Sequence, residues 1–428
     1  MSEHQMVLAT AALLIPAAGG LAQVFNVNQG IDYPNFQAAV DAAAANDVLE
    51  VRADVVLPSG TNFGFLSGIP LTIQGDVPTR KVTAGSAYNW GAAILPVGGA
   101  ITFKDLVLDG GAFPNAMIRA VGSNVTLQNV TMTNAFVGLQ PGAANGAHII
   151  DNSTITASDA GIQFIADPDQ SVTLQNGSVL LNCNTGVQIN AGLARCSLVV
   201  DASSIVGGAA RGIQVEGNDA LIVLQNGSMM KDKAGSGIVE ELAAFDTTIE
   251  ARDSVFDNNG PWHILVGDGG GGEKDLILER VTFWGGASGS NPLSALDAMT
   301  ATITHCIFAN WGAGGAGINA CCGFAGTIDN CVMVNDNLIL ANVDPLVPDT
   351  VLTSTVFPVI KTNAVGDVFS VFLDTNPASP DFLTINADPK GGDPRIAAAH
   401  LIDDVNNAGA KPVGGFVGTS SVQDWNLF

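Results

Sequence analysis

The chain is poor in basic and aromatic residues. It carries 16 Lys plus Arg against 40 Asp plus Glu, a formal net charge of −24, and only 6% of its 428 residues are aromatic. A surface this acidic repels phosphate backbones, which argues against nucleic acid as a partner. It also disfavours an anionic membrane surface or a polyanionic polysaccharide, unless a cation such as calcium bridges the two.

Cysteine pairs and long apolar runs are also lacking. The six cysteines do not make a disulfide framework in a chain this long, and the absence of a Cys-x-x-Cys pair argues against zinc. Beyond the N-terminus, no segment approaches the roughly 20 apolar residues of a membrane span. Charged residues make up 13% and hydrophobic residues 47%, so a large core is available and disorder is not expected.

The N-terminus carries an apolar run from Met6 to Ala22. It ends in Gly20-Leu21-Ala22, with small residues at the two positions that a signal peptidase reads. Glu3 and His4 stand where Lys or Arg is usual in a signal peptide. We predict a cleaved signal peptide over 1–22 and a secreted or cell-surface protein; a retained anchor and a buried first strand are the alternatives.

What the chain has in abundance is a short repeat built around the phrase Leu-Gln-Asn. When its copies are aligned on their last apolar residue, neighbouring copies lie 23 to 27 residues apart. This period is too short for two-helix repeats and suits one coil of three short strands. The aligned residues are Leu108, Met132, Ile155, Val179, Ile205, Met229, Phe256, Phe283, Phe308 and Met333.

Three columns follow from the alignment. Five places before the aligned residue the chain is apolar, as at Leu127, and four places before it is polar, as at Gln128, which is the alternation of a half-buried strand. Three places before it, Asn or Asp recurs; both tolerate the left-handed backbone of a sharp corner and can hydrogen-bond along a stack. The corner residues are Asp105, Asn129, Asn152, Asn176, Asn226, Asp253 and Asn330.

A second strand follows each corner, with the pattern Gly-apolar-Gln. The apolar residue is expected to point inward and the glutamine outward. Because successive rungs lie about 4.8 Å apart, the glutamines form an outward ladder. Together these columns predict an all-β, right-handed parallel β-helix of about ten or more rungs. The ladder residues are Gln140, Gln163, Gln188 and Gln214.

The two ends of the chain differ from the repeat. Residues 33–45 are typical of a short amphipathic helix with Asn35 as N-cap and Phe36, Ala39, Val40 and Ala43 on one face, which can cover the open end of a solenoid. Beyond residue 337 the period fades and Pro and Asp increase. We predict an N-terminal cap and first rungs over 23–100, repeats over 101–337, and an irregular C-terminal cap or appended segment over 338–428.

The chain resembles the pectin-lyase-like superfamily of right-handed parallel β-helices, including its uncharacterised bacterial secreted members. The resemblance is carried by Phe36-Gln-Ala-Ala-Val-Asp-Ala-Ala after Val27-Asn-Gln-Gly30, by the Gly-Ile-Gln and Leu-Gln-Asn rungs, and by tail segments such as Asn376-Pro-Ala-Ser-Pro380. It implies the fold and carries little about function.

The catalytic patterns of the superfamily's enzymes do not transfer to this sequence. Of the polygalacturonase patches only Asp403-Asp404 matches, and it lies in the tail. The Arg-x-Pro-x-x-Arg patch of pectate lyases is absent, and Gln423-Asp424 lacks the context of the pectin esterase pair. No catalytic residue is therefore carried over.

The repeat itself supplies a candidate acidic column. If the columns hold, Glu216 and Glu241 lie one rung apart, about 5 Å, the separation of acid and nucleophile in retaining glycosidases. Asp268, two rungs from Glu216, would approach the inverting spacing. Alternatively the stacked carboxylates of Asp167, Glu216 and Glu241 bind calcium, or an acidic protein simply exposes acids at loop positions.

Polar neighbours of this column are candidate substrate-binding residues. Gln163, Gln188 and Gln214 can hydrogen-bond sugars, and Trp262 can offer a stacking platform. His263 could act as a general base or be incidental to a long loop.

Three further features have structural interpretations, which we favour. The glycine-rich segment 268–275 is either a calcium loop or a bulge between rungs. Arg252 and Glu279 are expected to form a surface ion pair of little consequence. Cys306 and Cys331 share a column one rung apart, as a disulfide or a buried thiol stack.

Two classes of function remain. One is a non-catalytic scaffold that binds a glycan or a cell-surface partner, or that self-associates through the ends of the solenoid. The other is a secreted glycoside hydrolase acting at the acidic column; a lyase is less favoured because no basic column exists. No cofactor is expected except calcium, and no membrane span remains after signal cleavage.

Overall fold

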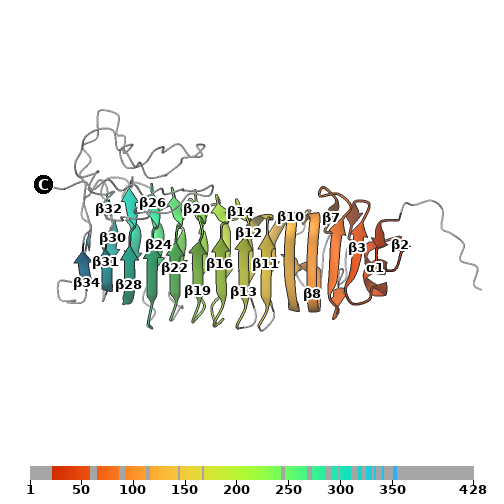
Figure 1. The fold of residues 1–428 in the computed structure, drawn as a ribbon, viewed down its shortest axis with the longest axis horizontal. Coiled ribbons are helices and arrows are strands. Elements are labelled where there is room, and N and C mark those ends of the chain that lie inside the picture. The colour runs from red at the N-terminus through yellow and green to blue at the C-terminus, as the bar shows by residue number, and fades with distance from the viewer. Residues whose placement is uncertain are drawn as a thin grey trace, which may run out of the picture.

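The computed structural model is a parallel β-solenoid, elongated along the axis on which its strands stack (Figure 1). This confirms the predicted right-handed parallel β-helix. Within the residues that the structure describes, no helix is long and apolar enough to cross a membrane. The structure describes residues 22–57, 65–85, 92–111, 116–142, 145–165, 168–241, 246–267, 272–285, 291–296, 298–309, 317–320, 324–329, 332–333, 340–341 and 350–353.

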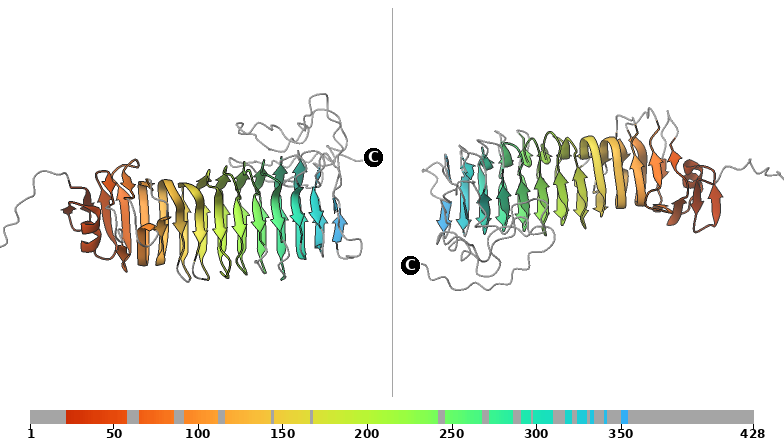
Figure 2. Two further views of the ribbon diagram at one scale, coloured as in Figure 1. Left: turned by 180° about the vertical axis from the view of Figure 1, so that it is seen from behind. Right: turned by 90° about the horizontal axis from the view of Figure 1, so that it is seen from above.

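Each rung contributes to three parallel sheets, which both views in Figure 2 show running the length of the stack. β8 (Ala92–Asp109), β10 (Val121–Gln140) and β12 (Thr154–Phe164) are long strands that pass from one sheet to the next. The first sheet adds β3 (Asp47–Val51), β6 (Leu71–Gly75), β11 (Ala147–Asp151), β13 (Ser171–Gln175), β16 (Ser197–Asp201), β19 (Leu221–Gln225), β22 (Thr248–Arg252), β25 (Asp275–Glu279), β28 (Met299–Thr304), β31 (Phe324–Asp329) and β34 (Thr350–Thr353).

The other two sheets are built in the same way. The second sheet adds β4 (Val55–Val56), β7 (Lys81–Thr83), β14 (Val179–Leu181), β17 (Ser204–Val206), β20 (Met229–Lys231), β23 (Val255–Asp257), β26 (Thr282–Trp284), β29 (Ile307–Ala309) and β32 (Val332–Met333). The third sheet adds β5 (Phe65–Ser67), β9 (Ala116–Arg119), β15 (Thr185–Ile189), β18 (Ile213–Val215), β21 (Ile238–Glu240), β24 (Trp262–Val266), β27 (Asn291–Ala295), β30 (Ile318–Ala320) and β33 (Leu340–Ala341).

The core is a set of apolar columns inside the three sheets. The predicted inward column of the first sheet is confirmed, since its described members from Leu127 to Ile328 are buried. On the second sheet Phe256, Phe283 and Phe308 stack face to face, with ring centroids 5.1 and 4.8 Å apart. Side chains of the same type therefore stack on one another from rung to rung, and the core extends along the axis of the solenoid.

The predicted corner column is also confirmed. All its described members have positive φ, between 45° at Asn152 and 57° at Asn226. Their amides bond along the axis: Asn226 Nδ2 donates to Asp201 Oδ1 at 2.6 Å, and Asn129 Nδ2 donates to Asp105 Oδ1 at 2.6 Å. The residue type at the corner is thus selected both by the left-handed backbone and by the rung beneath it.

In two rungs the buried residue of the second sheet is not the aligned residue but the one after it. Val179 and Met229 are only partly buried, and the following residue of each strand lies in the core instead. The cause is one extra glycine with positive φ after the corner Asn, which lengthens the rung by a residue and exchanges the two faces of the strand. The residues concerned are Gly177 and Leu180 in one rung and Gly227 and Met230 in the other.

α1 (Phe36–Ala42) lies at the N-terminal end of the stack (Figure 1). Asn35 is its N-cap as predicted, since Asn35 Oδ1 accepts from the amide of Ala38 at 2.8 Å. Beside it, β1 (Val24–Asn26) pairs antiparallel with β2 (Ile31–Tyr33) and with β3. Asp47 Oδ2 ties this end together, accepting from Asn26 Nδ2 at 2.7 Å and Ala44 N at 2.8 Å; the bond from Asn26 is the largest cause of its lowered pKa.

The predicted signal peptide over 1–22 falls, except for Ala22, outside the described residues, as does most of the predicted C-terminal segment over 338–428. Both assignments, and the boundaries at 100 and 337, remain predictions.

Candidate functional site

The glutamine ladder exists as predicted on the outer face of the third sheet. Gln140 Nε2 donates to Gln163 Oε1 at 2.8 Å, and Gln163 Nε2 donates to Gln188 Oε1 at 3.0 Å. These residues stand side by side in the register of β10, β12 and β15, and Gln214 of β18 continues the column. We call Gln140, Gln163 and Gln188 the glutamine ladder. Its role in substrate binding remains a prediction.

The hydrogen bonds between glutamine side chains stop at Gln214, whose amide bonds an acidic residue instead. The Gln214 side-chain amide donates to the Glu216 carboxylate two residues further along the chain. Glu216, the residue after β18, is therefore held by a residue of that strand. The glutamine column thus lies next to the candidate acidic column.

Glu216 and Glu241 are brought to adjacent rungs, as the sequence columns predicted. In the register of β18 and β21, Val215 pairs with Glu240, and the amide of Glu241 donates to Val215 O at 2.8 Å. The residues that follow, Glu216 and Glu241, are thus neighbours along the axis.

The sequence analysis missed the partner of Glu241, which is Arg211. Arg211 Nη2 lies 2.5 Å from Glu241 Oε1, and the two side chains are 36% and 26% exposed. Arg211 directly precedes Gly212 of the Gly-Ile-Gln motif, a position where neighbouring rungs carry Ala160 and Thr185. The signal that could have found it is this single basic residue in an otherwise uncharged column.

The remaining members of the predicted acidic column, Asp167 and Asp268, lie outside the described residues. The calcium ligand set of Asp167, Glu216 and Glu241 and the two-rung carboxylate pair therefore remain predictions. In the described part of the chain, no three His, Cys, Asp or Glu side chains gather closely enough to hold a metal ion.

His263 requires a correction, because it lies in strand β24 and in the core. Its Nδ1 accepts from Asn259 Nδ2 at 3.0 Å and its Nε2 donates to Gly285 O at 2.7 Å. Burial lowers the pKa of His263 to about 4. The side chain occupies the column that Gly237 holds one rung earlier, and it packs edge-on against Phe256. It does not reach the outer face, so it cannot serve there as a sugar-binding residue or general base.

Trp262, the residue before it, stays partly exposed. The register of β18, β21 and β24 places it in the same column as Arg211, two rungs further along. Its use as a stacking platform remains a prediction.

Two buried lysines were not expected from the sequence. Lys233 Nζ donates to Cys183 O at 2.9 Å and to Gly207 O, and burial lowers its pKa to about 8. Lys274 Nζ lies 3.3 Å from Glu240 Oε2. Because both groups lie inside the solenoid, we interpret them as structural.

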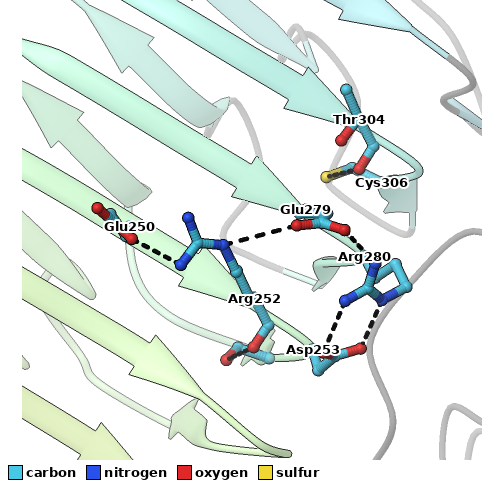
Figure 3. Close-up of polar contacts among 8 residues, drawn as sticks. Glu250, Arg252, Asp253, Glu279, Arg280, Thr304 and Cys306 are labelled. Atoms are coloured by element: carbon cyan, nitrogen blue, oxygen red, sulfur yellow. Dashed lines mark hydrogen bonds and ion pairs between the residues drawn. The ribbon is translucent and has the colours of Figure 1, made fainter.

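The predicted pair of Arg252 and Glu279 is confirmed and belongs to a larger network (Figure 3). Arg252 Nε lies 3.5 Å from Glu279 Oε2, and its Nη1 lies 2.7 Å from Glu250 Oε2. Arg280 stands at the corner with φ 54° and bonds Asp253 through two nitrogens, at 2.7 and 2.9 Å. These contacts hold a corner that has Arg in place of Asn, and the bidentate bond between Arg280 and Asp253 is the geometry in which such a pair can contribute to stability.

Cys306, close to the network in Figure 3, is buried, and its Sγ lies 3.3 Å from Thr304 O. Its column partner Cys331 lies outside the described residues, so neither the disulfide nor the thiol stack is tested.

No known protein family matches the chain, and neither does any curated protein. Among solved structures, the periplasmic alginate epimerase AlgG is similar at 11% identity over 76% of this chain and 88% of its own, with a TM-score of 0.43. Pectate lyase Pel9A is similar at 11% identity over 84% and 85%, with a TM-score of 0.40.

Proposed function

We propose that this protein is a secreted or cell-surface scaffold that binds a polysaccharide along the outer face of β10, β12, β15 and β18 without cleaving it. The observation that carries the proposal is the glutamine ladder, in which each amide is held by its neighbour at 2.8 to 3.0 Å. Side chains fixed in this way lose little conformational entropy when a ligand binds. The amides also repeat at the rung spacing, which suits a ligand that is itself a repeating chain.

The non-catalytic form of the proposal is supported by the partners of the two acids. Glu216 accepts from the Gln214 amide, and Glu241 pairs with Arg211. Both carboxylates are thus already engaged by a side chain of the protein, whereas a general acid or a nucleophile must present its carboxylate to the substrate.

A second candidate function, glycoside hydrolysis, is favoured by one observation. Glu216 and Glu241 stand on adjacent rungs, and the rung spacing of about 4.8 Å is close to the carboxylate separation of retaining glycosidases, about 5 to 5.5 Å. In that case Arg211 would be a positioning residue for Glu241.

The proposed location outside the cytoplasm is supported by the apolar run from Met6 to Ala22 and its small-residue end. Calcium enters the proposal only as an ion that could bridge an acidic surface and a ligand.

The test is to offer the purified mature protein a panel of polysaccharides, with and without calcium, and to measure both binding and the release of reducing-end or unsaturated product. Binding without product supports the scaffold. Product that is lost in a variant carrying Glu216→Gln and Glu241→Gln would make the protein an enzyme. Absence of both binding and product would contradict the proposed polysaccharide binding.

A further inference from the structure

We infer that the polysaccharide is uncharged and that it lies along the glutamine ladder, with its chain parallel to the solenoid axis. This inference rests on the proposed function, because it names the class of ligand for the same face. It depends on three observations: the chemistry of the ladder, the absence of charge beside it, and the charges at its ends.

The ladder has hydrogen-bonding capacity to spare. A glutamine amide has two N–H donors and an oxygen with two lone pairs. The bonds along the ladder use one donor of Gln140, one donor and one lone pair of Gln163, and one lone pair of Gln188. What remains is a row that both donates and accepts. Sugar hydroxyl groups also do both, so a neutral sugar can satisfy this row without an ion.

The positions beside the ladder are uncharged. In the register of β10, β12 and β15, Val137, Ala160 and Thr185 stand on one side of the glutamines, and all three are buried, so no charged side chain is presented from there. Beyond the strand ends, Ile165 and Asn190 follow on the other side. Among these described positions there is no cation to pair with a carboxylate, so a uronate chain would lose hydration there without compensation.

The charges at the Glu216 end of the ladder are already engaged. At one end Arg211 is paired with Glu241 at 2.5 Å, and Glu216 leaves that end with one negative charge in excess. At the other end Gln140 stands beside Arg119, which has an interaction of its own. An anionic chain running along the ladder would therefore approach Glu216 and a protein of net charge −24, and both repel it.

The experiment compares matched neutral and carboxylated ligands. Neutral polymers (hydroxyethyl cellulose, glucomannan and galactan) and carboxylated ones (carboxymethyl cellulose and polygalacturonate) are offered to the mature protein in affinity electrophoresis and calorimetry, at low and high salt. Whichever neutral polymer binds is then oxidised at its primary hydroxyls to carboxylates and measured again. We expect the neutral form to bind independently of salt and the oxidised form to bind at least about tenfold more weakly, since each tenfold corresponds to about 1.4 kcal/mol of repulsion and lost hydration.

The place of binding is tested with two matched double variants. Gln163→Ala with Gln188→Ala should weaken binding of the neutral polymer about tenfold or more, because it removes two hydrogen-bonding positions. Gln175→Ala with Gln225→Ala removes the same side chains from the outer face of the first sheet and should leave binding unchanged. Circular dichroism and thermal unfolding confirm that both variants keep the fold.

Each other outcome overturns a distinct statement. Equal or tighter binding of the carboxylated polymers overturns the uncharged ligand and leaves polysaccharide binding intact. Neutral binding that survives the loss of Gln163 and Gln188 overturns the ladder as its site. If no polymer of either class binds, the proposed function itself fails and this inference fails with it.

Discussion

Lys274 and Glu240 form an ion pair inside the solenoid, with Nζ 3.3 Å from Oε2 and the two side chains 1% and 0% exposed. Burial raises the pKa of Glu240, while Lys274 and a hydrogen bond with Thr247 act in the opposite direction. Glu240 occupies an inward position of the third sheet, where the preceding rung carries Val215. An acid has thus replaced an apolar core residue, and its partner comes from the residue before β25.

Breaking this pair from one side should destabilise the protein strongly. Lys274→Met leaves Glu240 buried without a counter-charge, and we expect a loss of about 3–5 kcal/mol in the free energy of unfolding at pH 7. Adding Glu240→Leu to Lys274→Met should restore most of it, because no buried charge is then left. Denaturant unfolding of the two single variants and the double variant measures the coupling; additive losses would show that the pair does not interact.

The pH dependence of the Lys274→Met variant provides a second check. Without Lys274 the raised pKa of Glu240 means that the folded protein holds a proton where the carboxyl of the unfolded chain, at its ordinary pKa of 4.5, has lost one. The defect should therefore be smallest below pH 4.5 and grow as pH rises through the folded-state value. A defect independent of pH, measured relative to the double variant, would contradict a buried carboxyl as its cause.

Buried histidines should make the protein sensitive to acid. Burial lowers the pKa of His263 and of His148 to about 4 from 6.5. Between these values the unfolded chain binds protons that the folded chain does not, so stability falls as pH drops from 6.5 to 4. Each histidine can contribute up to about 3 kcal/mol over that window.

The measurement is the slope of unfolding free energy against pH. His263→Phe and His148→Leu should each lower the slope between pH 6.5 and 4, and the double variant should lower it most. The free energy of unfolding of His263→Phe at pH 7 is expected to fall as well, because Asn259 and Gly285 lose their hydrogen-bond partner. An unchanged slope in the double variant would show that acid acts elsewhere.

The columns of the solenoid were predictable because each position in a rung imposes one structural requirement on its residue. Leu127 must be apolar because it points inward, Gln140 polar because it points outward, and Asn129 must tolerate a left-handed corner. A requirement repeated in every rung is visible in the sequence as a column, even without related sequences.

The features that could not be predicted are residues that differ from the repeated pattern in one rung only. Gly177 adds a residue to its rung, and an alignment on the last apolar residue cannot distinguish Val179 from the buried Leu180. Lys233 looks like a surface residue because charged residues are seldom fully buried. Arg211 is the single basic residue of its column, but its contact with Glu241 is a property of the side chains that no sequence column contains.

Two glycines of the same rung should respond differently to alanine. Gly177 has φ 79° and open space around an added Cβ, so Gly177→Ala costs only backbone strain, about 1–2 kcal/mol. An added Cβ on Gly186 would lie 2.5 Å from Gly212 O and 2.5 Å from Ile205 Cγ2, so Gly186→Ala must push adjacent rungs apart and should cost more. Thermal unfolding ranks the two variants, and Gly177→Asn should cost less than Gly177→Ala, because Asn tolerates positive φ. Equal losses at both glycines would contradict the close packing of the Gly-apolar-Gln strands.

The hydrogen bond between Asn226 and Asp201 offers a test of whether carboxylates on adjacent rungs can bind calcium. Asn226 Nδ2 donates to Asp201 Oδ1 at 2.6 Å, so Asn226→Asp replaces that bond by two stacked carboxylates. At pH 7 like charges on adjacent rungs should cost on the order of 1 kcal/mol, less at high salt, and the cost should vanish when acid protonates one of them. Asn226→Gly is the control, because glycine adopts the same φ of 57° and loses only the hydrogen bond. If calcium raises the unfolding temperature of Asn226→Asp but not of Asn226→Gly, paired carboxylates one rung apart bind the ion, and the same geometry at Glu216 and Glu241 becomes a calcium site once Arg211 is removed. If calcium changes neither variant, the spacing between rungs does not suit the ion, and a calcium role for the acidic column loses its physical basis.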